Sequence, residues 1–196
     1  DITGKSKNIF QLALYALFPW LSPYGPEEGV LETWDHYVSQ RGSRVIAVGG
    51  VDAHGIIGDY EEDFVTVSTY ILAPDPFNGE FGHDSALVYA AIREGRCFVG
   101  ADKVAKASSF RCHVESGGEL VQMGGTARLA RGANLAVSSP KPGLIRVIHD
   151  GVPLAEQLGS NLTIGLDRRG AYRVEVKRKA CGRYVPWIFG NHIYVV

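Results

Sequence analysis

The hydrophobic pattern along the chain changes near residue 103. Before that point, helix-like and strand-like stretches alternate. Within 27–40, apolar residues recur at three- and four-residue spacing and form one stripe, which predicts an amphipathic helix. On similar grounds helices are predicted over 8–21 and 84–94, and strands over 44–48, 64–72 and 96–99. The run 44–48 is apolar on both faces, which is typical of a strand in a helix-covered parallel sheet.

After residue 108 the helical period is lost, and short strand-like runs follow one another between turn signals. The predicted strands are 110–115, 128–138, 144–149, 161–166, 171–177 and 185–196. Asp150-Gly151 predicts a tight hairpin, because both turn positions tolerate a positive φ. Strands at this spacing are typical of a β-sandwich.

The two patterns together predict two domains. We expect an α/β domain over residues 1–103 and an all-β sandwich over residues 104–196. Small and polar residues dominate 101–109, where the boundary is predicted.

Composition and charge exclude several classes of protein. The 196 residues are 45% apolar and 21% charged, which is typical of a globular domain. The net charge of −1 argues against a protein that binds nucleic acid through phosphate contacts. The longest apolar run, 9–21, is too short to cross a membrane, and it lacks the features of a signal peptide.

The cysteines bear on the cellular compartment. Cys97, Cys112 and Cys181 are odd in number and far apart, so we expect buried reduced thiols and favour a cytoplasmic location. The first residue is Asp1 and the only methionine is Met123, so we expect sequence upstream of this chain. The oligomeric state is not predicted.

The segment Val48-Gly-Gly-Val-Asp-Ala-His-Gly55 carries the main candidate chemistry. Asp52 and His54 follow a predicted buried strand, and ligands bind beyond the carboxyl ends of strands in α/β folds. Residues i and i+2 of an extended backbone point to the same side, so both side chains could face one metal ion. A carboxylate and an imidazole suit Zn²⁺, Mn²⁺ or Fe²⁺. Alternatively, Asp52 caps the turn and His54 bonds to the backbone.

A resemblance favours the metal hypothesis. The stretches Trp34-Asp35, Val45-Ile-Ala-Val-Gly-Gly-Val-Asp-Ala-His-Gly55 and Ala90-Ala-Ile-Arg-Glu-Gly-Arg-Cys-Phe-Val99 resemble the C-terminal part of a PHP (polymerase and histidinol phosphatase) domain. The resemblance implies a distorted β/α barrel with a cluster of two or three metals, phosphoesterase-like activity, and Asp52 and His54 as metal ligands. The end of the chain, Trp187-Ile-Phe-Gly-Asn-His-Ile-Tyr-Val195, is similar to the last strand of the β-sandwich that many members carry.

The chain also departs from that family. The family opens with a His-x-His motif, and no such motif exists among the six histidines at positions 36, 54, 83, 113, 149 and 192. Catalytic metal sites use three protein ligands plus water, so two ligands do not suffice. We therefore expect the C-terminal fragment of a larger hydrolase, inactive by itself, that contributes Asp52 and His54.

Two further residues are candidates for binding a phosphoester or a related small-molecule substrate. His83 precedes a predicted helix and could reach the metal cluster, or it is a loop residue beside the helix N-cap. Arg96 follows the end of that helix and could meet a substrate phosphate, or it pairs with a last-turn carbonyl.

A second function class stays open: a non-catalytic β-sandwich module that binds a partner protein or a glycan. Tyr184, Trp187 and Tyr194 could form a carbohydrate-stacking face, although aromatic residues on strands are usually core residues. A His-x-His motif in upstream sequence would favour the hydrolase.

Overall fold

A computed structural model describes residues 25–27, 29–51, 60–180 and 182–196. The helices are α2 (Val30–Ser39), α3 (Tyr60–Asp63) and α4 (Phe81–Glu94). The first strands are β1 (Ser68–Ile71), β2 (Cys97–Gly100), β3 (Arg111–Ser116), β4 (Glu119–Gln122) and β5 (Thr126–Ala127). The later strands are β6 (Asn134–His149), β7 (Val152–Gly165), β8 (Gly170–Ala180), β9 (Arg183–Gly190) and β10 (Ile193–Val195). The predicted helix over 8–21 lies outside the described residues.

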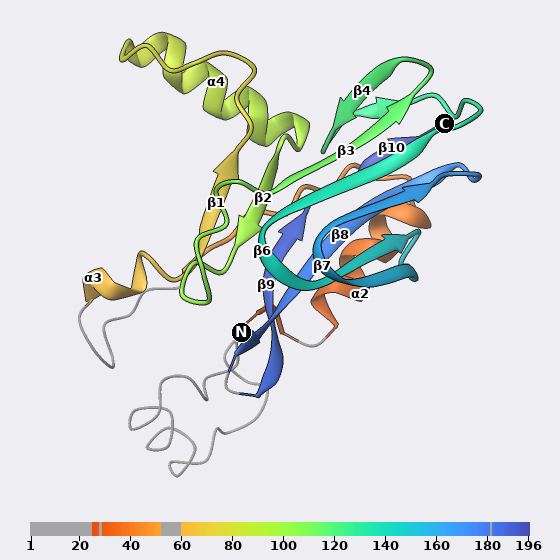
Figure 1. Cartoon of the computed structure of the whole chain (residues 1–196). Helices are drawn as coiled ribbons and strands as arrows, with labels where there is room; N and C mark the ends of the chain where they lie inside the picture. Colours follow the sequence, from red (N-terminus) through yellow and green to blue (C-terminus); the bar gives the residue numbers. More distant parts are fainter. Residues whose placement is uncertain (1–24, 28, 52–59, 181) are drawn as a thin grey trace.

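The strands form one curled sheet in the order β1-β2-β9-β8-β6-β3-β4 (Figure 1). Strand β7 pairs with the other edge of β6, and β10 joins β8 to β5. Among the described strands, only β10 and β5 are parallel; the other pairs are antiparallel. The sheet therefore arises from hairpins and returns, not from βαβ crossovers.

The fold class predicted from the sequence is wrong. The described chain has no β/α barrel followed by a sandwich, because β1 and β2 belong to the same antiparallel sheet as the later strands. Strand β2 pairs with β9 from Phe98↔Gly190 to Gly100↔Ile188. This pairing crosses the predicted boundary near residue 103, although the two-domain division itself stays a prediction.

Two turns predicted from local sequence had different outcomes. The Asp150-Gly151 hairpin is confirmed: β6 pairs with β7 up to His149↔Val152, and the two turn residues have φ of 48° and 83°. The predicted break at residues 140–143 is wrong, since β6 runs through it as a single strand. The register shifts between Ser138 and Gly143, where Pro140 and Pro142 cannot donate to the ladder.

The curled sheet encloses the main hydrophobic core. Its fully buried side chains come from β2 to β10 and include Phe98, Phe110, Met123, Leu135, Ile145, Trp187 and Ile193. A second, smaller cluster holds α2 against β8 through Trp34, Val38 and Ala171. Cys97 and Cys112 are buried free thiols, as expected, and Cys181 lies outside the described residues.

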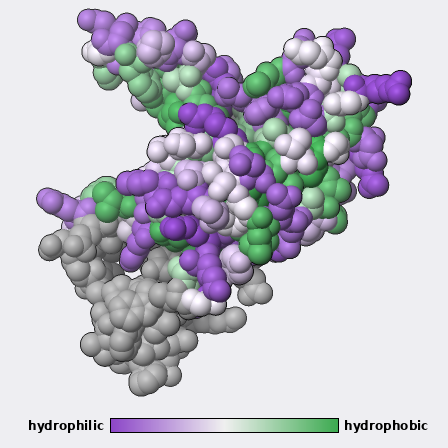
Figure 2. All heavy atoms as spheres, viewed as in Figure 1, coloured by the Kyte–Doolittle hydropathy of each residue, from purple (hydrophilic) through white to green (hydrophobic). Residues whose placement is uncertain are grey.

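Helix α4 projects from the sheet as an arm (Figure 1). The helix predicted over 84–94 is confirmed and ends at Gly95, whose φ is 75°. Of the residues of this helix only Ala91 is buried, while Phe81 is 86% exposed and Tyr89 66% exposed. Figure 2 shows a hollow between this arm and the part of the sheet formed by β3 and β4.

Candidate functional site

The segment that leads to Asp52 is extended but is not a strand. Residues 44–51 make no ladder with a neighbouring strand in the described structure, so the strand predicted over 44–48 is wrong. Val45 is 40% exposed and Val48 57% exposed, so the run is not buried on both faces either. A short apolar run in a sequence is compatible both with a central strand and with an extended segment that lies along a sheet without joining it.

Side chains replace the missing strand partner at alternate residues. Trp34 of α2 donates from Nε1 to the carbonyl oxygen of Val45 at 2.8 Å. Asn191 brackets Ala47: its Oδ1 accepts from the Ala47 N–H at 2.8 Å and its Nδ2 donates to the Ala47 carbonyl at 3.0 Å. These bonds, with those described next, satisfy backbone groups that a neighbouring strand would otherwise pair.

Thr69 of β1 forms hydrogen bonds with the backbone of Gly49, the last of these alternate residues. Its Oγ1 accepts from the Gly49 N–H at 2.9 Å and lies 3.4 Å from the Gly49 carbonyl oxygen. A Cβ at Gly49 would lie 2.7 Å from a methyl of Val67 and 2.8 Å from one of Val99. A side chain at this position would therefore collide with the sheet, so packing requires glycine here.

Asp52 and His54 lie outside the described residues, so their side-chain directions stay a prediction. Among the residues that the structure describes, no group of three or more His, Cys, Asp or Glu side chains could hold a metal ion. The structure therefore describes the backbone up to Val51, and metal binding by Asp52 and His54 stays a hypothesis.

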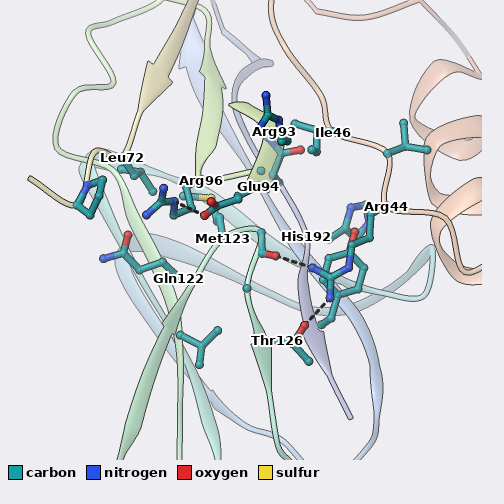
Figure 3. Close-up of a pocket in the computed structure, with 18 of the residues that line it drawn as sticks. Arg44, Ile46, Leu72, Arg93, Glu94, Arg96, Gln122, Met123, Thr126 and His192 are labelled. Carbon is teal, nitrogen blue, oxygen red and sulfur yellow. Dashed lines mark hydrogen bonds and ion pairs between the residues drawn. The ribbon is translucent and has the colours of Figure 1, made fainter. Parts of the chain in front are cut away.

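A large cleft lies at the opposite end of β2 from Gly49. Its volume is about 770 Å³, within the range of small-molecule sites. Its walls come from 44–46, 72–74, 93–96, 120–126 and 191–194 (Figure 3). At its base two backbones touch, because a side chain at Gly124 would collide with the carbonyl oxygen of Glu94.

Three arginines line this cleft. Arg44 donates to the carbonyl oxygen of Gly124 at 3.1 Å and to Oγ1 of Thr126 at 2.5 Å, and its guanidinium lies 4.4 Å from the ring centre of Tyr194. Arg44 thus ties the extended segment to the sheet. Arg93 is exposed on the last turn of α4, and Arg96 precedes β2.

Arg96 and His83, the two predicted substrate-binding residues, are not brought together. His83 is in the first turn of α4, exposed, with Nε2 3.4 Å from the carbonyl oxygen of Pro76. Arg96 follows the other end of the helix, about 20 Å away at 1.5 Å per residue. Only Arg96 lines the cleft. Its Nε lies 3.0 Å from Oε2 of Glu94, without the geometry of a hydrogen bond.

A buried cluster of charges forms the wall behind the cleft. Arg173 of β8 makes two hydrogen bonds to the Asp35 carboxylate, at 2.5 and 2.6 Å, and one to Glu175 at 2.6 Å. His192, which lines the cleft, has Nε2 3.3 Å from Oδ1 of Asp35. The cluster joins α2 to the sheet through side chains that are at most 7% exposed.

The environment shifts the pKa values of this cluster in different directions. Burial alone would raise the pKa of Asp35, but hydrogen bonds from Arg173 and His192 and the charge of Arg173 lower it. Burial would lower the pKa of Arg173, but Asp35 and Glu175 raise it. Burial lowers the pKa of His192, against the opposing effect of Asp35. Asp35 is therefore a carboxylate, and His192 is a neutral imidazole near pH 7.

Sequence reasoning missed this cluster. Asp35 belonged to the resembling stretch Trp34-Asp35 but was given no role, and Arg173, Glu175 and His192 were not singled out. The available signal was the pair Arg173 and Glu175, two opposite charges two residues apart within a strand of buried residues. Residues at i and i+2 share one face of a strand, so such a pair indicates a buried ion pair.

The proposed carbohydrate-stacking face is also corrected. Trp187 is fully buried and donates from Nε1 to the carbonyl oxygen of Ala105 at 2.6 Å. Tyr184 is 43% exposed at the start of β9, and Tyr194 lies under Arg44. Trp187 is therefore a core residue and cannot stack on a sugar.

In the part of the chain that the structure describes, no helix is long and apolar enough to span a bilayer.

Comparisons with known proteins add no identification. The chain was compared with family profiles, with curated proteins and with solved structures, and none of them matched.

Proposed function

We propose that this chain is part of a metal-dependent phosphoesterase-like hydrolase, with Asp52 and His54 as ligands of a divalent metal. Zn²⁺, Mn²⁺ or Fe²⁺ suits this pair of ligands. Such an ion would polarise a phosphoryl oxygen and lower the pKa of a bound water. The resemblance to the PHP superfamily suggested this function. We retain from it only the metal-ligand pair and the reaction class, not the β/α barrel.

One observation carries the proposal: the backbone that leads into Asp52 is bound at alternate residues by side chains from α2, from β1 and from the turn between β9 and β10. Trp34, Asn191 and Thr69 bind the backbone of residues 45, 47 and 49. Metal affinity depends on ligands that are positioned before the ion arrives, because ordering them costs conformational entropy. A hydrogen-bonded segment leading to the Asp-x-His pair supports the use of this pair as metal ligands.

The proposal is tested by titrating the whole chain with Mn²⁺ and Zn²⁺ in a calorimeter. We expect weak, exchangeable binding, because the chain supplies two protein ligands, and a further loss of at least tenfold in Asp52→Ala and in His54→Ala, because each removes one of the two. His36→Ala is the matched control, since His36 is exposed on α2, and it should bind metal as the wild type does.

A second readout tests the reaction class. In a longer protein that supplies the remaining ligands, Asp52→Ala and His54→Ala should each abolish most of the metal-dependent phosphoester hydrolysis. The hydrolase proposal fails if neither substitution changes metal affinity or hydrolysis.

The second candidate, a non-catalytic module that binds a protein partner, is favoured by exposed apolar side chains. Val30, Tyr37 and Val48 are each about half exposed and line one groove between α2 and the extended segment 45–50. Large exposed apolar patches are typical of interaction surfaces. The hydrolysis assay in the longer protein separates the two candidates, because only the hydrolase loses metal-dependent activity when Asp52 or His54 is replaced.

A further inference from the structure

An uncharged apolar groove lies between α2 and the extended segment 45–50. Its volume is about 570 Å³, and the described residues that line it include no charged side chain. Val30, Tyr37 and Val48 are each about half exposed there. The sheet contributes Val99 of β2 and Phe189 of β9. Contiguous apolar surface of this kind marks a place that another segment or molecule covers.

The described part of the chain begins at this groove. Gly25 and Pro26 are its first residues, and both line the groove. Gly25 packs closely on β9, because a Cβ at this position would lie 2.9 Å from Cγ of Pro186. The sequence upstream of residue 25 therefore joins the described structure at the wall of the groove.

The upstream sequence contains the longest apolar run of the chain, 9–21, which lies outside the described residues. Only Gln11 and Pro19 interrupt it, and it carries no charge. The helix predicted over 8–21 is therefore apolar on all sides, which is typical of a buried helix. A single helix of this length is marginal in water, so it depends on packing against another surface.

We propose that the groove is the docking site of the apolar run 9–21 of the same chain. The connection from Leu21 to Gly25 spans at most about 14 Å, so the run stays beside the groove. Neither the run nor the lining of the groove carries a charge, so docking buries no unpaired ion. An occupant from another molecule loses translational and rotational freedom on binding, whereas a run on a short tether is present at a millimolar effective concentration.

This inference concerns the groove that favours the second candidate function, and it assigns an occupant from the chain itself. A partner protein that binds the groove must then displace 9–21. The inference does not depend on metal binding by Asp52 and His54, so its failure is distinct from failure of the metal titration.

The test is hydrogen exchange of the whole chain, measured by mass spectrometry without metal. We expect the amides of 9–21 to be protected in the wild type and to exchange at least tenfold faster in Val48→Asp, which places a charge in the groove. Val30→Asp, on the α2 side of the groove, should have the same effect. Val152→Asp is the matched control, because Val152 is 65% exposed on β7 and does not line the groove. Amides of β6 should stay protected in all three variants, which shows that the sheet is folded.

Sedimentation equilibrium of the wild type identifies the source of the occupant. We expect the amides of 9–21 to be protected in the monomer, independently of protein concentration. Protection that appears only when the chain dimerises would assign the occupant to a second copy and overturn docking within one chain. Unprotected amides over 9–21 in the wild type, or equal exchange of 9–21 in Val48→Asp and Val152→Asp, would overturn the docking site itself.

Discussion

The two parts of the described chain differ in how they use their apolar residues. Residues 101–196 bury them: Tyr172, Leu135, Ile145 and Trp187 are at most 1% exposed inside the curled sheet. Residues 25–100 leave many exposed, from Val30 on α2 to Tyr89 on α4. Most apolar residues of the later part therefore form a core, whereas many of those in the earlier part lie at the surface.

The difference shows what holds each part in place. The later strands are stabilised by buried apolar area, which contributes roughly 25 cal/mol per Å². The earlier segments are attached to the sheet largely by polar bonds, such as those of Asp35 to Arg173 and of Ala47 to Asn191. Polar attachments contribute less per bond and allow local opening at a lower free energy.

The largest effect is expected from Arg173→Met. The substitution leaves the carboxylates of Asp35 and Glu175 buried without their cation, which costs about 3–5 kcal/mol of unfolding free energy. Urea unfolding followed by tryptophan fluorescence measures it. Lys179→Met, at an exposed position on the same strand, should change the stability by less than about 0.5 kcal/mol. Equal stability of the two variants would show that the buried pair does not attach α2.

A somewhat smaller effect tests the contrast between the two parts directly. Leu135→Ala in the sheet core should lose about 2–5 kcal/mol, through lost burial and the cavity left behind. Phe81→Ala removes a larger side chain that is 86% exposed and should stay within about 0.5 kcal/mol of the wild type. Urea unfolding measures both variants. A comparable loss of unfolding free energy in the two would show that the later part does not depend more on buried apolar side chains than the earlier part does.

Asn191→Ala should cost about 1–3 kcal/mol, because backbone groups of Ala47 and Cys97 lose their partner. Hydrogen exchange measures where this loss falls. We expect the amide of Ala47 to exchange faster while core amides of β6 change little. Asn134→Ala, which removes an exposed bond to Glu115, is the control and should leave Ala47 protected.

The smallest effect is a dependence of stability on pH. The folded-state pKa of His192 lies below its ordinary value of 6.5, so the unfolded chain binds the proton first. The free energy of unfolding should be constant above pH 6.5 and fall below it, by at most about 1.4 kcal/mol per pH unit. Asp35, whose pKa lies below 3.8, adds a further loss below that pH.

Urea unfolding at pH 7.5, 6.0 and 5.0 measures this dependence. His192→Gln should flatten it between pH 7 and 5, whereas His36→Ala should retain it. A wild-type stability that rises as the pH falls from 7 to 5 would mean that His192 becomes charged in the folded protein.

Part of the candidate site could be predicted from the sequence and part could not. From its position after a helix, Arg96 was predicted either to meet a substrate phosphate or to pair with a last-turn carbonyl; the structure places it in the cleft, beside Glu94. The cleft itself could not be predicted, because its walls come from five segments between residues 44 and 194. Nor could the cluster behind it, since Asp35 and Arg173 are 138 residues apart.

What the sequence determined by itself was local. The three- and four-residue spacing of apolar residues predicted α2 and α4, and Asp150-Gly151 predicted the hairpin, because each depends on interactions within a few residues. The tertiary structure alone decided which strands pair, and so joined β2 to β9 and left 44–51 bound by side chains instead of a strand. An apolar stretch of sequence does not specify which segment it packs against, because burial is favourable against any apolar surface. Only the long-range geometry of the fold selects the partner.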